Sequence, residues 1–596
     1  MKKEFQKNII ITLILSVICA VQGFVALSAS IEPIEIWEKK EAPIMERYAL
    51  GVFILFLLVF AVALLSKRVP IALGICSLAI NILALINYYE ILFHGTVTTF
   101  QDIWNIPTVL NVIGAYEPQF GWPVYLITAT ILPVCLILIF IGKRNLDFRR
   151  HIIAGTITVA LFFVSCWYAV FAPFAPAGST QWNWEMQYYK DSYVLGMLNS
   201  IKTFVNPVMK PDGYSPEKIA AEEGFAGRRK SYPDIIVILN ESWYNPDHFM
   251  DFGLNTSVTK NYDALDAYKG YAAVPNSGGG TNGSEFELLT SNSMQIINSS
   301  APFNTMGMNN ARSIVDYLES LGYCTLAAHC DSANNYRRNT AWKAMGFDHT
   351  YFRDEFTDKK QYGDRYFYTD SSAFENFKRF YNDLPEGQPR FAYLLTMQNH
   401  GGYEFNRPEW DTVHISNYNG LSSETAEWMN EYLSSVKLTD EFIGELKEWI
   451  SASDRDIIVY MVGDHCPPMI SSMTDESVAN SENDLKKRQT PYLIYSNFKI
   501  VEMPSNNNID LCALTPYVLK AADLPLSPYY RKLLEISEDV QCFTNVDADT
   551  DSVTGGFISV DGSIRKAEEY ESLMKYYYME FNNLKWSERN DLLFEP

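Results

Sequence analysis

Five long apolar stretches occupy the first third of the sequence and constrain its fold more than any other feature. Each is long enough, or nearly so, to cross a bilayer, which takes about 20 residues. Buried core helices are the alternative, and the first stretch could also be a cleaved signal peptide because small residues, Ala26 and Ala29, lie near its end. Five stretches so close together favour a transmembrane α-helical domain over residues 1–173. The predicted spans are Asn8–Ser28, Tyr48–Leu65, Ile71–Leu92, Trp122–Ile141 and Ile152–Phe171.

The Lys and Arg residues beside the spans predict which side of the membrane each loop occupies. Basic residues precede the first span and separate the second from the third and the fourth from the fifth, whereas residues 94–121 contain none. This asymmetry predicts a cell-membrane protein with a cytoplasmic amino terminus and an extracellular part after Pro173. The basic residues are Lys2, Lys3, Lys7, Lys67, Arg68, Lys143, Arg144, Arg149 and Arg150.

The charge is distributed unevenly along the chain. The whole sequence has a net charge of −22, and residues 1–173 carry +2, so the remainder carries −24. Such acidity speaks against nucleic acid as a partner, because binding it requires a basic patch. It fits a domain outside the cell that holds divalent cations. Five of the nine Cys lie in this part, and an odd number implies no complete disulfide framework.

Composition divides the chain after the spans into three parts. Residues 174–232 are expected to be a linker, 233–540 the extracellular catalytic domain, and 541–596 an extension that packs on that domain. Ala175-Pro-Ala177 has small residues at the positions that a signal peptidase reads. Cleavage and release after Ala177 is therefore a further expectation, with a plain Pro/Ala linker as the alternative.

The acidic part alternates short apolar runs with amphipathic segments, a pattern typical of an α/β domain with a mostly parallel central sheet. Its apolar runs are nearly continuous, as expected of strands buried on both faces. Residues 312–321 fit a helix between two of them. The predicted strands are Asp234–Asn240, Tyr323–Ala328, Phe391–Met397 and Asp456–Val462.

Polar side chains follow each of these strands. The first is followed by Glu241, the second by His329, the third by Asn399-His400 and the fourth by Asp464-His465. Ligands of open parallel sheets lie at the carboxyl ends of the strands. A capping carboxylate or a surface histidine would explain any one residue, but together they predict a site with metal ligands and acid–base groups.

A glycine-rich segment, Asn276–Glu285, offers a nucleophile. It runs into a helical beginning at Phe286, so Thr281 is expected at or just before a helix start, exposed to solvent. Backbone N–H groups and the positive end of the helix dipole favour an anion such as phosphate there. A divalent cation would lower the pKa of the Thr281 hydroxyl and make it a usable nucleophile. A plain surface loop is the alternative.

These motifs resemble the lipoteichoic acid synthase family of membrane phosphoglycerol transferases, within the alkaline phosphatase/sulfatase superfamily. The resemblance rests on Glu241-Ser242, on Gly280-Thr281 with Glu285-Phe286, and on Gly463-Asp464-His465. Two further segments, residues 93–112 and 211–215, look like the family's outer loop and its pre-domain segment. Five spans followed by an outer sulfatase-like domain is also the family's architecture.

The resemblance implies roles for single residues. Glu241, Thr281, Asp464 and His465 would bind one divalent cation, Mn²⁺ first and Mg²⁺ second. Thr281 would also be the nucleophile, and His400 would protonate the leaving oxygen. The family's phosphoglycerol pocket would comprise His329, Tyr336, where the family often has Trp, and Arg338, beside a second arginine, Arg337.

The implied reaction is a two-step transfer. Thr281 attacks the phosphodiester of phosphatidylglycerol or a similar phospholipid, diacylglycerol leaves, and a glycolipid or cell-envelope polymer then takes the glycerophosphate, as in lipoteichoic acid synthesis. Phosphoethanolamine transfer is an alternative, although such enzymes tend to have paired disulfides. A sensor or scaffold built on the same domain is the non-enzymatic alternative.

Overall fold

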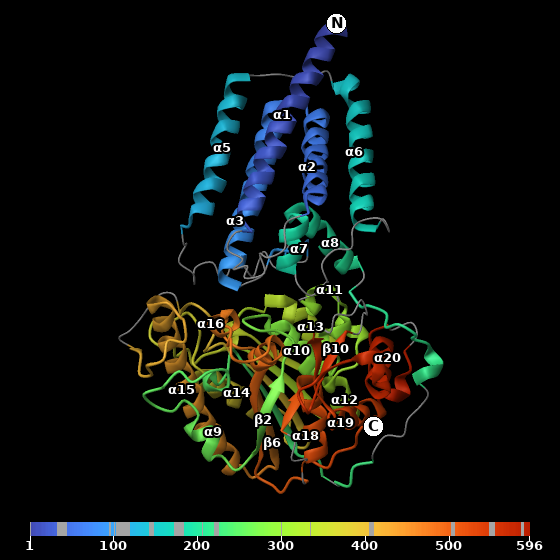
Figure 1. Ribbon diagram of the computed structural model, residues 1–596. Coiled ribbons are helices and arrows are strands. Elements are labelled where there is room, and N and C mark those ends of the chain that lie inside the picture. Colours follow the sequence, from blue (N-terminus) through green and yellow to red (C-terminus); the bar gives the residue numbers. More distant parts are fainter. Residues whose placement is uncertain are drawn as a thin grey trace. The chain divides into compact units, whose positions relative to one another are not determined.

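The structure is a computed structural model of the chain (Figure 1), which divides into two compact units. The amino-terminal unit comprises residues 1–103 and 118–206, and the carboxyl-terminal unit residues 104–117 and 207–596. The residues described are 2–31, 44–94, 97–100, 102, 120–141, 148–171, 184–205, 207–219, 226–229, 231–297, 299, 301–333, 335–403, 410–501, 503, 507–546, 555–585 and 589–595.

The amino-terminal unit consists of helices. Its long apolar helices are α1 (Lys2–Ala29), α2 (Met45–Leu65), α3 (Val69–His94), α5 (Trp122–Ile141) and α6 (Phe148–Phe171). Over their described residues, α1, α2, α3 and α6 are long and apolar enough to cross a membrane, and α5 contributes the shorter apolar segment Trp122–Leu132. The predicted apolar helices are thus present. The side of the membrane that each end faces stays a prediction.

Two shorter helices follow α6 within the same unit, α7 (Trp184–Asp191) and α8 (Tyr193–Val205). Both lie inside the segment expected to be a linker. They form because Tyr188 and Tyr193 are buried in the core of the helical unit. A buried ion pair of 2.6 Å between Arg47 of α2 and Asp191 of α7 also fixes them. Ala177 lies outside the described residues, so cleavage there stays a prediction.

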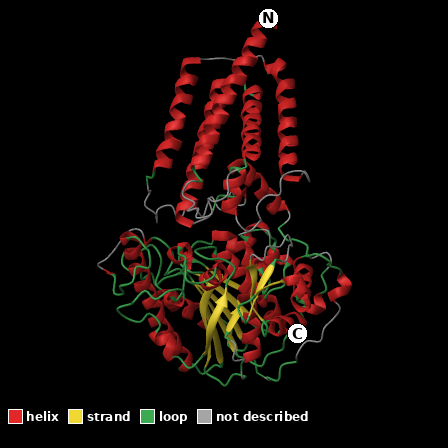
Figure 2. Cartoon of the chain, viewed as in Figure 1, coloured by secondary structure: helices red, strands yellow, loops and turns green. Residues whose placement is uncertain are grey.

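The carboxyl-terminal unit contains all the strands that the structure describes (Figure 2). Eight of them form one sheet in the order β4-β3-β5-β1-β6-β7-β2-β8, and only β7 runs antiparallel to its neighbours. The predicted mostly parallel sheet is thereby confirmed. The strands are β1 (Asp234–Asn240), β2 (Tyr268–Ala273), β3 (Cys324–His329), β4 (His349–Tyr351), β5 (Arg390–Leu395), β6 (Ile457–Gly463), β7 (Gln489–Ser496) and β8 (Asn508–Asp510).

Helices cover both faces of this sheet, and each face has its own apolar core. Alternate residues of β1 enter opposite cores: Ile235 and Val237 pack in one, Ile236 and Ile238 in the other. On the first face lie α10 (Thr281–Thr290), α11 (Pro302–Thr305), α12 (Ile314–Ser320), α13 (Arg338–Met345), α18 (Leu514–Ala521), α19 (Pro528–Ile536) and α20 (Glu571–Leu584). On the second lie α14 (Asp370–Asn382), α15 (Ser423–Ser451) and α16 (Pro468–Ser472). Two further helices are α9 (Lys260–Ala264) and α17 (Asn480–Arg488).

The last part of the chain adds a small antiparallel sheet of β9 (Val540–Val546), β10 (Gly556–Ser559) and β11 (Ile564–Lys566). Helix α20 follows it, and its side chains Leu573, Tyr576 and Tyr577 are buried in the first core together with β1. This segment therefore shares a core with the large sheet.

Candidate active site at the carboxyl edge of the sheet

Sheet topology brings the acidic residues and His465 together. Strands β1 and β6 are neighbours, with Asn240 paired to Gly463, so the residues that follow them leave the sheet side by side. The ligand atoms of Glu241, Asp464 and His465 lie within 4.8 Å of one another, and all three side chains are buried. Three of the four predicted metal ligands thus meet at the predicted edge.

The orientation of His465 fits a cation. Its Nδ1 lies 2.9 Å from the carbonyl oxygen of Cys466, which accepts its hydrogen. Nε2 therefore faces the carboxylates, 3.2 Å from Asp464 Oδ2 and 3.6 Å from Glu241 Oε1. In the neutral ring this nitrogen carries a lone pair, so a proton or a cation must lie between the lone pair and the carboxylate oxygens.

Electrostatics support the same interpretation. Burial, together with the charge of Glu241, raises the pKa of Asp464 to about 7. Burial alone would lower the pKa of His465, but Asp464 and Glu241 outweigh it and raise that pKa. Apart from His465 Nε2 at 3.2 Å, no described residue offers a hydrogen-bond donor to the buried Asp464 Oδ2. Two carboxylates, one imidazole and an orphaned oxygen fit a divalent cation that accepts oxygen and nitrogen ligands.

Ser242 also belongs to this cluster, a role that its motif alone does not predict. Its N–H donates to Asp464 Oδ1 (2.7 Å) and its hydroxyl donates to Glu241 Oε1 (2.9 Å). The residue has a φ of 48°, in the left-handed region that non-glycine residues rarely adopt. This turn bends the chain directly after β1 so that one residue orients both carboxylates.

Thr281 lies where predicted, at the first position of α10. Its hydroxyl donates to Glu241 Oε2 over 3.3 Å, which joins it to the metal cluster. The preceding Gly280 has a φ of 90°, and a side chain there would clash with Asn276, whose amide donates to the Gly280 carbonyl. The expectation of an exposed Thr281 is wrong: only 8% of it is accessible, because helix α10 is buried along its whole length.

His329 and Arg338 are brought together, but deep in the protein. His329 ends β3, with Nδ1 3.2 Å from the carbonyl oxygen of Leu395 and Nε2 3.4 Å from Arg338 Nη1. Burial, and next the charge of Arg338, hold the pKa of His329 well below its usual value, so the ring is neutral. The ring of Tyr336 lies 5.1 Å from the guanidinium carbon of Arg338, whereas Arg337 is exposed.

The partner of Arg338 is Glu285, a role that its motif alone does not predict. Arg338 Nε donates to Glu285 Oε2 (2.9 Å), and Trp342 Nε1 donates to Glu285 Oε1 (2.8 Å). Both members of this ion pair are buried. Since Glu285 lies one helical turn after Thr281, the pair also fixes the helix that carries the predicted nucleophile.

His400 lies in the loop after β5 and is half-buried. Its ring packs on Phe367 at 4.6 Å between centroids, and its carbonyl accepts a hydrogen bond from Arg365. The charge of His400 is among the lesser influences that lower the pKa of His329. It therefore lies near the predicted pocket, and its role in proton transfer stays a prediction.

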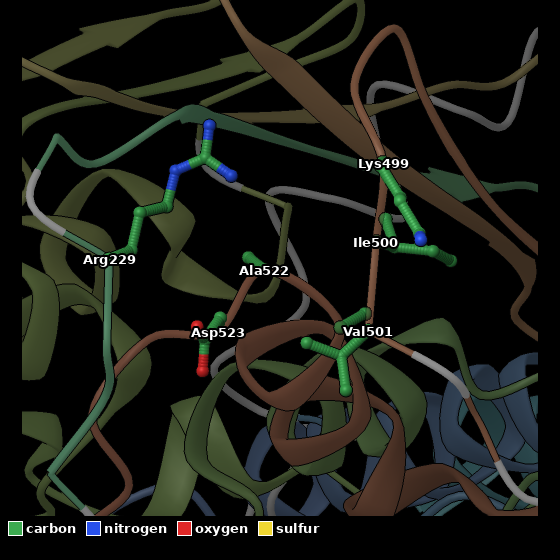
Figure 3. Close-up of a pocket in the computed structure, with 7 residues that line it drawn as sticks. Arg229, Lys499, Ile500, Val501, Ala522 and Asp523 are labelled. Carbon is green, nitrogen blue, oxygen red and sulfur yellow. The ribbon is translucent and has the colours of Figure 1, made fainter.

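A cavity of about 620 Å³ opens at the other end of the sheet (Figure 3). It is lined by Arg229 and Lys499, among others, and Arg229 pairs with Asp456, the residue before β6. A strand of seven residues is about 23 Å long, so this cavity is separate from the cluster at the far end of β1 and β6.

Comparison with known proteins agrees with this architecture. Residues 233–524 match the sequence model of the family described as Sulfatase, a stretch that contains Glu241, Thr281 and Asp464. A Rhizobium meliloti protein, provisionally named a cyclic beta-1,2-glucan modification protein, is 27% identical over 312 residues, 51% of this chain and 47% of that protein. An uncharacterized Haemophilus influenzae protein is 20% identical over 52% of this chain and 60% of its own length. The chain thus spans only about half the length of these curated relatives.

Solved structures show the same fold. Streptococcus pyogenes phosphoglycerol transferase GacH, in complex with sn-glycerol-1-phosphate, superposes with a TM-score of 0.51 at 22% identity, over 63% of this chain and 95% of GacH. Neisseria meningitidis lipooligosaccharide phosphoethanolamine transferase A, an integral membrane protein, gives 0.50 at 14% identity over 88% of this chain and 95% of that one. The carboxyl-terminal unit is thus a sulfatase-type domain. The match to the Sulfatase family model and the apolar helices before the matched residues agree with the architecture that the motifs predicted.

Proposed function

We propose that the chain is a metal-dependent phosphoglycerol transferase that moves glycerophosphate from a membrane phospholipid, such as phosphatidylglycerol, to a glycolipid or envelope polymer. The observation that carries this proposal is the position of the Thr281 hydroxyl at the start of α10. It is hydrogen-bonded to Glu241, which lies beside Asp464 and His465. The name of GacH, bound to sn-glycerol-1-phosphate, supports the choice of headgroup. The apolar helices would keep the enzyme at the bilayer, where the donor lipid resides.

Glu241, Asp464, His465 and Thr281 would hold one divalent cation. We favour Mn²⁺, then Mg²⁺, because carboxylate and hydroxyl oxygens with a single imidazole suit these ions. When bound, the cation would neutralise charge on the phosphoryl oxygens and favour ionisation of the hydroxyl.

The transfer takes place in two steps, and residues of the chain move the protons in each. In the first, the Thr281 oxygen bonds to phosphorus while its proton passes to Glu241 Oε2, the atom that already accepts it. The bond from phosphorus to the diacylglycerol oxygen breaks, and His400 gives that oxygen a proton. In the second step an acceptor hydroxyl bonds to phosphorus and gives its proton to His400. The bond from phosphorus to the Thr281 oxygen breaks, and Glu241 returns its proton to that oxygen. The amino end of α10 holds the anionic phosphate in place throughout.

Phosphoethanolamine transfer is the second candidate. It is favoured by the likeness to the Neisseria transferase, which extends over 88% of this chain and so includes apolar helices. Against it, no disulfide joins the cysteines that the structure describes, whereas paired disulfides are typical of such enzymes. The intact cluster around Thr281 speaks against a sensor or scaffold without activity.

One experiment separates these functions. Full-length protein in detergent is given vesicles that contain labelled phosphatidylglycerol or labelled phosphatidylethanolamine, with Mn²⁺, and the release of diacylglycerol is measured. Release from phosphatidylglycerol alone is expected, and it should vanish in Thr281→Ala. Release from phosphatidylethanolamine alone would replace our proposal by the second candidate. No release from either lipid, with and without an added glycan acceptor, would contradict both.

A further inference from the structure

A second group of acidic side chains lies on the other side of α10. Glu287 of α10, Asp510 at the end of β8 and Cys512, in the 3-10 turn Leu511–Ala513, place their ligand atoms within 4.8 Å of one another. None of the three side chains is exposed to solvent. The proposed catalysis uses none of them.

Glu580 of α20 lies near this group: burial, and then the charges of Glu287 and Asp510, raise its pKa well above the usual value. Its side chain is completely buried, and neither carboxylate oxygen accepts a hydrogen bond from the described residues. Its charge and those of Glu287 and Asp510 act on Cys512: burial first, then these three carboxylates, raise the pKa of the thiol well above its usual value. A third carboxylate thus lies near the other two, and no cation is paired with it among the described residues.

The surrounding tyrosines do not neutralise this charge. Tyr576 and Tyr529 donate their hydroxyl hydrogens to the carbonyl of Ser291, and Tyr577 donates to the carbonyl of Phe543. The nearby cation Arg488 binds Asp484 at 2.7 Å, and its charge also acts on Asp510, so it offsets at most one of the three carboxylates. Buried carboxylates without a compensating charge are unfavourable, so they are usually paired or coordinate a metal.

We infer that Glu287, Asp510, Cys512 and Glu580 form a second, structural site for a divalent transition-metal ion, best suited to Zn²⁺. Zinc accepts carboxylate oxygen and thiolate sulfur together, usually in fourfold tetrahedral coordination, and closed structural sites supply all four ligands from protein. This ion would join α10, which carries Thr281, to strand β8 and to the carboxyl-terminal helix α20. The inference is independent of the transferase activity.

Metal counting tests this site. The double variant Glu241→Gln/Asp464→Asn disables the first cluster, and its zinc content is measured on full-length protein after chelation and reloading. One zinc per chain is expected, falling to none when Glu580→Gln is added. The matched control is Glu571→Gln, an exposed glutamate of the same helix, which should leave one zinc. No zinc in the double variant would overturn the inference.

Two further measurements keep the test decisive if Glu580→Gln folds poorly. Cadmium loading of the same double variant should give a thiolate charge-transfer absorption that Cys512→Ser removes and Cys324→Ser, a change at a buried cysteine of β3, does not. Zinc should also raise the melting temperature of the double variant. If instead these carboxyls share protons, cadmium would give no thiolate absorption and zinc would not raise the melting temperature. Glu580→Gln would then be as stable as its parent.

Discussion

The charge of Asp464 should destabilise the metal-free protein, and replacing it with asparagine should relieve this. The pKa of Asp464 is raised from 3.8 to about 7, mainly by burial and then by Glu241. At 1.36 kcal/mol per pH unit, this corresponds to at most about 4 kcal/mol. Because the folded state binds the proton more tightly than the unfolded state, the free energy of unfolding falls as pH rises from about 4 to about 7, and the loss persists above that.

Asp464→Asn should fit the site. Oδ1 accepts hydrogen bonds from the N–H groups of Ser242 (2.7 Å) and His465 (2.8 Å), and an asparagine oxygen can accept both. The asparagine nitrogen would take the place of Oδ2, which accepts no hydrogen bond from the described residues. The metal-free variant should therefore be more stable than wild type at pH 8, by up to about 4 kcal/mol, and the two should converge toward pH 4.

Mn²⁺ should narrow this difference in stability. A ligand at 100 times its Kd stabilises the folded state by about 2.7 kcal/mol, and the variant should lose most of that gain because it lacks one anionic ligand. Thermal unfolding of full-length protein with EDTA or Mn²⁺, at pH 5 and pH 8, measures both effects. A metal-free variant less stable than wild type at pH 8, or an equal Mn²⁺ effect on both proteins, would refute the reasoning.

Three further predictions concern the proposed chemistry. Thr281→Ala should abolish transfer, and mass spectrometry should no longer find the glycerophosphate adduct expected on Thr281. The free energy of unfolding should change by about 1 kcal/mol or less, because one hydrogen bond is lost. An adduct on another residue would contradict this prediction. Arg338→Lys should lower kcat/KM by roughly 10- to 150-fold, because one charge-assisted hydrogen bond is worth about 1.5–3 kcal/mol. It should also lower the melting temperature, whereas replacing the exposed Arg337 with lysine should change neither quantity. Equal losses in both variants would mean that the pocket residue is wrongly assigned. Exhaustive treatment with EDTA should stop diacylglycerol release and Mn²⁺ should restore it; turnover that persists without metal would exclude a metal-dependent reaction.

The sheet and the site edge were predictable from sequence because their signals are local. Buried parallel strands are continuous apolar runs, and the structure ends β1 at the predicted residue and β6 one residue later. Since parallel strands end at one edge, the residues after them had to be neighbours. Helices α7 and α8 were missed, although Tyr193–Val205 contains apolar residues at helical spacing, because the polar segment around them resembles a linker.

Contacts between distant segments could not be predicted. The Glu285–Arg338 pair joins residues 53 positions apart, and nothing local distinguishes a buried glutamate on α10 from an exposed one. The same holds for Glu580, whose helix has an amphipathic sequence but is buried along most of its length. The role of Ser242 depends on a left-handed backbone that only the turn after β1 requires.

Helix α10 explains why these unpredicted residues bear on the proposed chemistry. It is a buried helix with polar groups on several sides, and each is bound differently: Thr281 to Glu241, Glu285 to Arg338 and Trp342, Glu287 to the backbone of Met294. Since Thr281 and Glu285 are one turn apart, a change at Glu285 or Arg338 shifts the hydroxyl that faces Glu241. Loss of activity in an Arg338 variant therefore does not by itself show contact with substrate. A contact with the donor headgroup would raise KM for the lipid, whereas a shift of α10 would lower kcat and melting temperature together.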